Sequence, residues 1–154
     1  MEKEWLYRSI DSADIKEAIE LYIEVFSAEP WNDQLTFQQI ADYIKSLQGM
    51  NTFKGFILRN EATGKLTGVA LGFVRPWYQG LEYHMDAFYI SNELQRKGIG
   101  SCFMTKIKQS LAEENIPDII LDTERGYPAE GFYLKNGFNA LAASVLLSAS
   151  TQEV

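Results

Sequence analysis

The sequence predicts an α/β fold built on a mixed sheet, antiparallel in its first part and parallel in its last. Three observations lead to this class. Hairpin-type loops at 60–65 and 76–80 separate three apolar runs in the middle of the chain. A glycine-bearing loop then joins the third run to an amphipathic segment, and a further apolar run follows at 118–122. The expected order is β-α-α-β-β-β-α-β-α-β, with six to seven strands and about four flanking helices.

The N-terminal elements follow from periodicity and capping residues. A short strand is expected over 5–10, and Asp11 or Ser12 caps a helix whose apolar stripe ends at Phe26. The segment 29–33 breaks that helix. Thr36 caps a second helix that runs to about residue 48, where Gly49 ends it.

The remaining elements are strands and two further helices. Strands are expected at 52–59, 66–74 and 82–90, followed by the glycine loop and its helix. The run 118–122 is a strand expected to be buried on both faces. Pro128 opens a short helix that ends near 136–137, and the apolar stretch 138–147 is expected to be a last strand. We expect residues 1–154 to form a single domain.

Composition excludes several classes of protein. The hydrophobic share of 46% is typical of a globular chain, and no apolar run reaches the roughly 20 residues that span a bilayer. The net charge of −7 disfavours nucleic acid as a partner. A lone cysteine, Cys102, offers neither a disulfide nor a metal site. We expect a cytoplasmic protein without a metal and without a membrane segment.

The charge is unevenly distributed. Residues 1–50 hold ten acidic and four basic residues, whereas the remainder is nearly balanced. An acidic half suggests a cationic ligand, although acidic side chains on helix surfaces also serve solubility alone.

The glycine loop is the most informative segment. Arg96, Lys97, Gly98 and Gly100 lie between an apolar run and a helix, where unpaired N–H groups converge beside the positive end of the helix dipole. Glycines allow the main chain to approach an anion closely. The loop therefore favours a phosphate or pyrophosphate site, with an ordinary strand-to-helix turn as the alternative.

Two motifs together resemble the GNAT superfamily of acetyl-coenzyme A-dependent N-acetyltransferases. The segment 95–100, Gln-Arg-Lys-Gly-Ile-Gly, is similar to the family's Gln/Arg-x-x-Gly-x-Gly/Ala signature. The segment 129–138 is similar to its second hallmark, a helix that ends in Phe-Tyr-x-Lys-x-Gly-Phe. The resemblance covers nearly the whole chain and implies a GNAT fold with acetyl-CoA as cosubstrate. A departure occurs at Gly126, where the family often has Asn.

The resemblance also implies roles for individual residues. The backbone of Phe88, Tyr89 and Ile90 would pair with the pantetheine arm, in a slot between this strand and the 119–122 strand. Tyr133 would protonate the leaving thiolate. The pyrophosphate would be held by the signature segment, which comprises Gln95, Arg96, Lys97, Gly98, Ile99, Gly100 and Ser101.

The acceptor side is expected on the strand before the glycine loop, because the attacking amine must lose a proton. Glu82, His84 and Asp86 share one face by strand alternation, which a bulge would change. His84 or Asp86 could be the base, directly or through water, and Asp86 could instead bind the ammonium. Either residue could merely satisfy a buried hydrogen bond. Glu82, Glu124 and Trp31, the last in an acidic loop, are further candidates for binding a cationic acceptor.

Three functions remain open from the sequence. The first is acetyl transfer to a primary amine of a small cationic molecule, by direct attack in a ternary complex. Parts of the sequence look similar to aminoglycoside acetyltransferases, which favours this acceptor class. The second is acetylation of a peptide N-terminus or lysine, and the third is a non-catalytic module that binds acyl-CoA. A monomer or a homodimer is expected, since dimers are frequent in the family.

Overall fold

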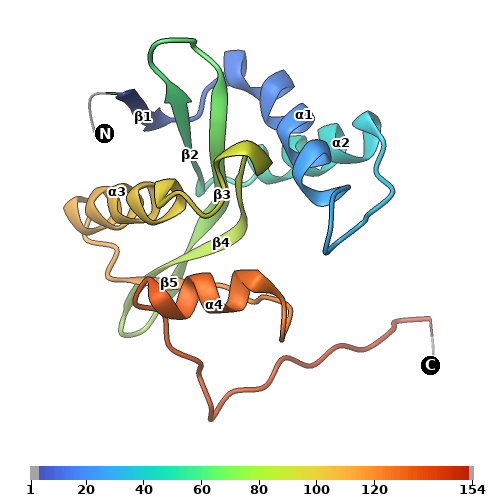
Figure 1. The fold of residues 1–154 in the computed structure, drawn as a ribbon. Helices are drawn as coiled ribbons and strands as arrows, with labels where there is room; N and C mark the ends of the chain where they lie inside the picture. Colours follow the sequence, from blue (N-terminus) through green and yellow to red (C-terminus); the bar gives the residue numbers. More distant parts are fainter. Residues whose placement is uncertain (1–3, 153–154) are drawn as a thin grey trace. The chain divides into compact units, whose positions relative to one another are not determined.

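The computed structural model describes residues 4–152. These residues fall into two compact units, divided between Asp122 and Thr123. The larger unit begins with a strand and two helices, continues with three strands, and ends with a helix and a short strand (Figure 1). Its elements are β1 (Trp5–Ser9), η2 (Ser12–Asp14), α1 (Ile15–Phe26), α2 (Phe37–Gln48), β2 (Phe53–Asn60), β3 (Leu66–Trp77), β4 (Gly80–Ile90), η3 (Asn92–Leu94), α3 (Ile99–Glu113) and β5 (Asp118–Ile120). The smaller unit holds α4 (Pro128–Lys135).

The sheet confirms the predicted mixture of strand directions. Its order is β1-β2-β3-β4-β5, with antiparallel pairs from β1 to β4 and a parallel pair between β4 and β5. The parallel pair follows from the crossover through α3, because a strand that returns by a helix runs in the original direction. The strand β5 is shorter than predicted and partly exposed rather than buried on both faces, since it lies at the edge of the five-stranded sheet.

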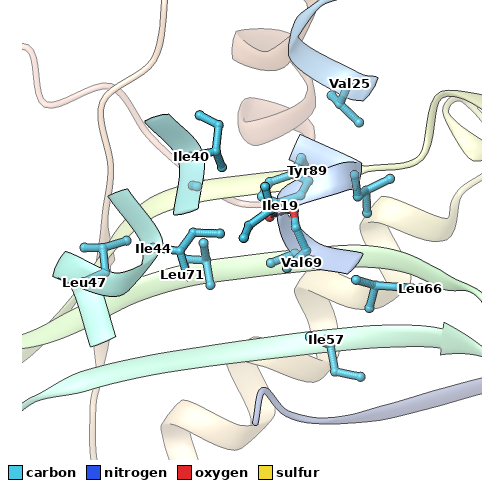
Figure 2. Packing of buried hydrophobic residues seen from close by; sticks show 13 residues of the cluster. Ile19, Val25, Ile40, Ile44, Leu47, Ile57, Leu66, Val69, Leu71 and Tyr89 are labelled. Carbon is cyan, nitrogen blue, oxygen red and sulfur yellow. Dashed lines mark hydrogen bonds between the residues drawn. The ribbon is translucent and has the colours of Figure 1, made fainter. Parts of the chain in front are cut away.

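Helices cover both faces of this sheet in the larger unit (Figure 1). Thr36 caps α2 as predicted and forms a capping box, in which Thr36 accepts from the Gln39 amide and the Gln39 side chain accepts from the Thr36 amide. Figure 2 shows α1 and α2 packing their apolar stripes on the sheet, with Ile19 beside Val69 and Ile44 beside Leu71. The opposite face carries α3, which buries Phe103, Met104, Ile107 and Leu111. Each such side chain stabilises the fold by about 1.5–3 kcal/mol.

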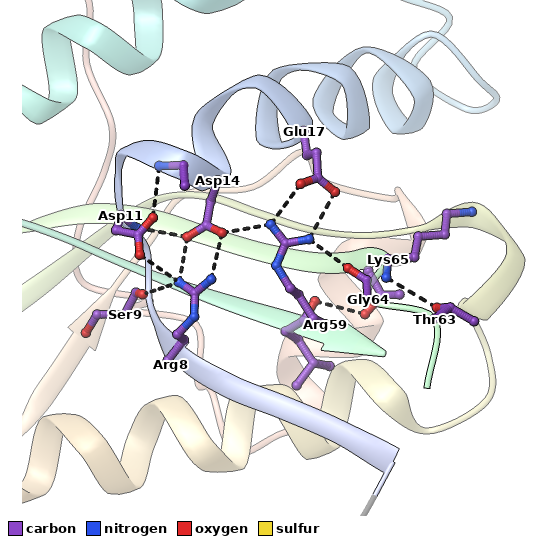
Figure 3. Close-up of polar contacts among 12 residues, drawn as sticks. Arg8, Ser9, Asp11, Asp14, Glu17, Arg59, Thr63, Gly64 and Lys65 are labelled. Carbon is purple, nitrogen blue, oxygen red and sulfur yellow. Dashed lines mark hydrogen bonds and ion pairs between the residues drawn. The ribbon is translucent and has the colours of Figure 1, made fainter. Parts of the chain in front are cut away.

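A buried carboxylate fixes the start of α1 to the sheet (Figure 3). Asp14 is 1% exposed and accepts from Arg8 of β1 at 2.6 and 2.8 Å and from Arg59 of β2 at 2.7 Å. It also accepts from the amide of Asp11, which caps η2. The hydrogen bonds from Arg8, and then those from Arg59, hold the pKa of Asp14 well below its usual range. The first turn of the helix is thereby tied to two strands.

The smaller unit corrects one prediction. No strand forms over 138–147, so the described residues contain five strands rather than six or seven. The side chains of Leu141, Val145, Leu146 and Leu147 are 62–82% exposed. A strand needs a neighbour to pair its backbone groups, and the alanines at 140, 142 and 143 have low strand propensity. The sequence pattern detected apolar residues there but could not supply a partner.

Candidate active site

The glycine loop connects the end of β4 to α3 through two left-handed residues. Arg96 has φ +68° and Gly98 has φ +79°, and Gly98 is the N-cap of α3. Within residues 4–122, the N–H groups of 96 to 101 reach no backbone or side-chain acceptor. The first turn of a helix leaves such donors unsatisfied, and the left-handed residues turn further amides toward the same region. The loop can therefore bind an anion.

Gln95 fixes this loop to the strand that precedes it. Its side-chain amide donates to the carbonyl of Ile90 at 3.1 Å and to Asn92 Oδ1 at 3.0 Å. Ser91 is the N-cap residue of η3, which begins at Asn92 and lies between β4 and the glycine loop. The glutamine of the signature thus holds the loop in shape, whereas the side chains of Arg96 and Lys97 are exposed cations.

The pairing of β4 with β5 ends well before this loop, because β5 is only three residues long. The parallel ladder joins only Glu82, Tyr83 and His84 to Asp118–Ile120. It does not continue alongside the last six residues of β4, although the ladder with β3 on the other side runs to Ile90. The resemblance to the family implied a slot for an extended ligand between these two strands. Residues 88–90, which were expected to line it, lie beyond the end of the β4–β5 ladder.

Glu82 and His84 each contact a residue of the neighbouring strand β3, whereas Asp86 contacts a residue of α2. Glu82 is opposite Arg75 of β3 and accepts from its guanidinium at 2.6 Å. This ion pair occupies the Glu82 carboxylate, whose side chain is 15% exposed. Glu82 is therefore placed to orient Arg75 and to influence the charge near His84.

His84 lies in the last residue pair of the ladder between β4 and β5, opposite Ile120. Burial, and then the charge of Arg75, lower its pKa below 6.5, against the opposing effects of Glu82, Asp122 and Asp86. Its ring stacks on Phe73 of β3, with centroids 5.3 Å apart. The Nε2 atom is buried and has no hydrogen-bond partner among the described residues. A buried imidazole nitrogen without a partner can accept a proton from a bound ligand.

Asp86 occupies a β-bulge that the strand pattern did not reveal. Leu71 of β3 faces Ala87 and Gly72 faces Met85, so Asp86 has no counterpart. Its carboxylate accepts a hydrogen bond from the Tyr43 hydroxyl of α2. Tyr43 was absent from the sequence prediction, because 43 residues separate the pair and no local pattern joins them.

Trp31 lies in the loop between α1 and α2 and is partly buried. Its ring packs edge-on against Phe26 at 5.0 Å, and Phe26 in turn lies 4.5 Å from Tyr22. The aromatic packing joins this loop to the rings beside Asp86, since Tyr22 contacts Tyr43 at 5.8 Å. The loop also brings Asp33 near the same rings. Burial, and to a smaller extent the charge of Asp33, raise the pKa of the Tyr22 phenol.

Two predicted residues belong to the smaller unit. Tyr133 of α4 packs edge-on between Phe132 and Phe138, at 5.4 and 5.3 Å. Burial raises its pKa to about 12, so the phenol stays protonated at neutral pH. Glu124 is exposed ahead of α4. Gly126, which stands where the family often has Asn, donates its backbone amide to the Glu130 side chain at 2.9 Å. This glycine is therefore hydrogen-bonded within the smaller unit.

The described residues 4–152 contain no group of three His, Cys, Asp or Glu side chains that could hold a metal ion. No helix among them has the length and apolarity to cross a bilayer.

The model of the acetyltransferase (GNAT) family matches residues 15–138, which is most of the chain. This protein is therefore a member of the GNAT family, as the two sequence motifs predicted, and its class is that of an acetyltransferase. No curated protein matches the chain.

Solved structures share the fold at low sequence identity. An aminoglycoside acetyltransferase from an uncultured soil metagenomic sample, in complex with sisomicin, is 17% identical with TM-score 0.73, covering 97% of both chains. A possible acetyltransferase from Clostridium difficile 630 is 16% identical with TM-score 0.79, covering 96% of this chain and 98% of that one. Glucosamine-6-phosphate N-acetyltransferase from Arabidopsis thaliana is 18% identical with TM-score 0.64, covering 96% and 98%. At these identities the likeness concerns the fold alone.

Proposed function

We propose that this protein transfers the acetyl group of acetyl-CoA to a primary amine of a small cationic acceptor, by direct attack in a ternary complex. One observation carries the proposal: within residues 4–122, the amides of 96 to 101 reach no acceptor at the start of α3, directly after a strand whose ladder with β5 stops short. That arrangement suits a ligand with an anionic group at one end and an extended amide-bearing arm.

The residues present fit the diphosphate of coenzyme A. A Cβ built on Gly98 would meet no atom within 4 Å, so the space in front of the loop is open. The amides of 96 to 101 would hold the pyrophosphate, and the exposed Arg96 and Lys97 would add positive charge. The main chain of 88–90 would pair with the arm as an added strand. When bound, acetyl-CoA supplies a thioester that an amine can attack.

Side chains on β4 would prepare the amine. A free alkylamine is mostly ammonium at neutral pH and cannot attack until it loses a proton. The Asp86 carboxylate would bind the ammonium, and the neutral His84 would accept the proton at Nε2. The attacking nitrogen then forms the new C–N bond. As the C–S bond breaks, the Tyr133 hydroxyl would give its proton to the leaving thiolate sulfur, and the second proton that the nitrogen loses on becoming an amide would pass through solvent to restore the phenol.

The charges and rings around Asp86 support a cationic acceptor. Asp33 and Asp86 lie near the Tyr22 ring, which also contacts Phe26 and Tyr43. Carboxylates beside aromatic faces attract ammonium groups. The fold neighbour solved with sisomicin, an aminoglycoside, is consistent with such an acceptor. The family match spans parts of both compact units, so we also propose that they form one catalytic domain.

Two measurements test this function. Calorimetry with acetyl-CoA should show binding, and an absence of binding would refute the cofactor site. Release of the coenzyme A thiol is then followed with sisomicin, spermidine, lysine and a lysine-rich peptide as acceptors. We expect turnover with at least one of the three small amines. Turnover with the peptide alone would favour a peptide acetyltransferase, and binding without turnover on any amine would leave only a binding module.

A further inference from the structure

Asp86 is turned out of the strand ladder by the bulge in β4. Because it has no counterpart in β3, its position is not fixed by cross-strand pairing in the way that His84 is fixed opposite Phe73. The residue is also exposed. An exposed carboxylate on a short side chain would otherwise sample several rotamers, so its orientation depends on side-chain contacts.

The only group within residues 4–122 that donates to this carboxylate is the Tyr43 hydroxyl, which binds Oδ2. Burial, and then the hydrogen bond to Asp86, raise the pKa of Tyr43 far above its ordinary value. The phenol therefore keeps its proton and acts as a donor. A donor on Oδ2 leaves Oδ1 to accept from another group.

The Tyr43 ring packs at one end of a series of aromatic rings from α1 and β4. It packs edge-on against Tyr22 of α1 with centroids 5.8 Å apart, and Tyr22 packs edge-on against Tyr89 of β4 at 5.2 Å. Tyr89 is anchored in turn, because its hydroxyl donates to the carbonyl of Ala18 at 2.8 Å. This series of packed rings fixes the direction from which the Tyr43 hydroxyl reaches Asp86.

We propose that Tyr43 is a positioning residue for the acceptor amine: its hydroxyl holds Oδ2 of Asp86 so that Oδ1 accepts from the acceptor's ammonium group. This inference rests on the function proposed above. It assigns to α2, which carries none of the family motifs of this sequence, a part in choosing a cationic acceptor. Tyr43 would act through Asp86 without touching the reacting atoms.

The test is a double-mutant cycle on acceptor kinetics. Tyr43→Phe keeps the ring in its packing and removes only the hydroxyl. With whichever of the four probes above the wild type acetylates fastest, we expect KM for the amine to rise about tenfold, because a hydrogen bond to a charged group is lost. The change in kcat should be smaller, and KM for acetyl-CoA should not move. Asp86→Asn should have an effect at least as large.

The two changes should not multiply. If Tyr43 acts only through Asp86, the double variant Tyr43→Phe/Asp86→Asn should match Asp86→Asn alone. Tyr7→Phe is the matched control, because it removes a hydroxyl that bonds Ser110 at 2.8 Å on the opposite face of the sheet. Its acceptor kinetics should equal those of the wild type.

The failures are distinguishable. Unchanged amine KM in Tyr43→Phe, or effects of the two variants that multiply, would overturn the inference while the wild type remains active. A rise in KM for acetyl-CoA equal to that for the amine would also overturn it, since it would indicate a general disturbance of the fold. A wild type that acetylates none of the four probes would instead remove the proposed function, and this inference with it.

Discussion

The glycine loop offers the sharpest test of the cofactor site, through the change Gly98→Ala. Gly98 has φ +79°, and an L-residue in this left-handed region costs about 1–2 kcal/mol. The added methyl meets no protein atom within 4 Å, so strain is its only cost in the free protein. For a chain of 154 residues, each 1 kcal/mol lowers Tm by about 2–4 °C.

The loss of cofactor binding should exceed this strain. The methyl would lie in the open space that the diphosphate is proposed to fill, and would move the anion away from the amides of 96 to 101. Each hydrogen bond to a charged group contributes about 1.5–3 kcal/mol, so losing one or two weakens acetyl-CoA binding by about 3 kcal/mol, or roughly a hundredfold. Calorimetry with acetyl-CoA measures this directly.

Gly64→Ala is the matched control for strain. Gly64 has φ +73°, also has no atom within 4 Å of a built Cβ, and lies in the hairpin loop between β2 and β3. Both variants should lose similar stability in thermal unfolding, but only Gly98→Ala should lose affinity. If Gly98→Ala binds acetyl-CoA as tightly as Gly64→Ala does, the proposed pyrophosphate site is wrong.

Three further predictions concern stability and catalysis. Asp14→Asn should cost about 3 kcal/mol in urea unfolding, because it removes a buried carboxylate that accepts three hydrogen bonds from the guanidinium groups of Arg8 and Arg59. Because folding lowers the pKa of Asp14, its carboxylate stabilises the wild type fully above the unfolded pKa of about 4, and this contribution should disappear as the pH falls further. The control Glu93→Gln, which removes one partner of an exposed ion pair, should change the free energy of unfolding little. Tyr133→Phe should lower kcat at least tenfold with Kd for acetyl-CoA unchanged, and equal kcat would exclude its role as acid. Acceptor kcat/KM should fall as pH drops through the pKa of His84, below 6.5, and a limb that persists in His84→Gln would assign the base elsewhere.

The parts of the fold that local chemistry determines could be predicted from the sequence. Thr36 marked the start of α2, Pro128 marked α4, and the two motifs identified the family. These features depend on residues close together in the chain, where capping and glycine conformations act directly.

Features that depend on distant segments were missed. The bulge at Asp86 arises from the register between β3 and β4, and the one sequence sign was Gly72, where a Cβ would lie 2.0 Å from the carbonyl oxygen of His84. Tyr43 reads as one more residue of an amphipathic helix until the sheet brings it to Asp86. The strand expected over 138–147 failed for the opposite reason, since the apolar residues were present without a neighbouring strand.

The early end of the ladder between β4 and β5 has a consequence for how the proposed cofactor site can evolve. A carrier gripped through peptide groups is recognised by atoms that every residue possesses, so substitutions along the end of β4 leave that grip intact as long as the strand keeps its course. Selection on those positions then comes from packing against the helices and not from the carrier. The side chains that we propose to bind the acceptor project from the same strand, so acceptor preference would be free to diverge while the donor stays the same.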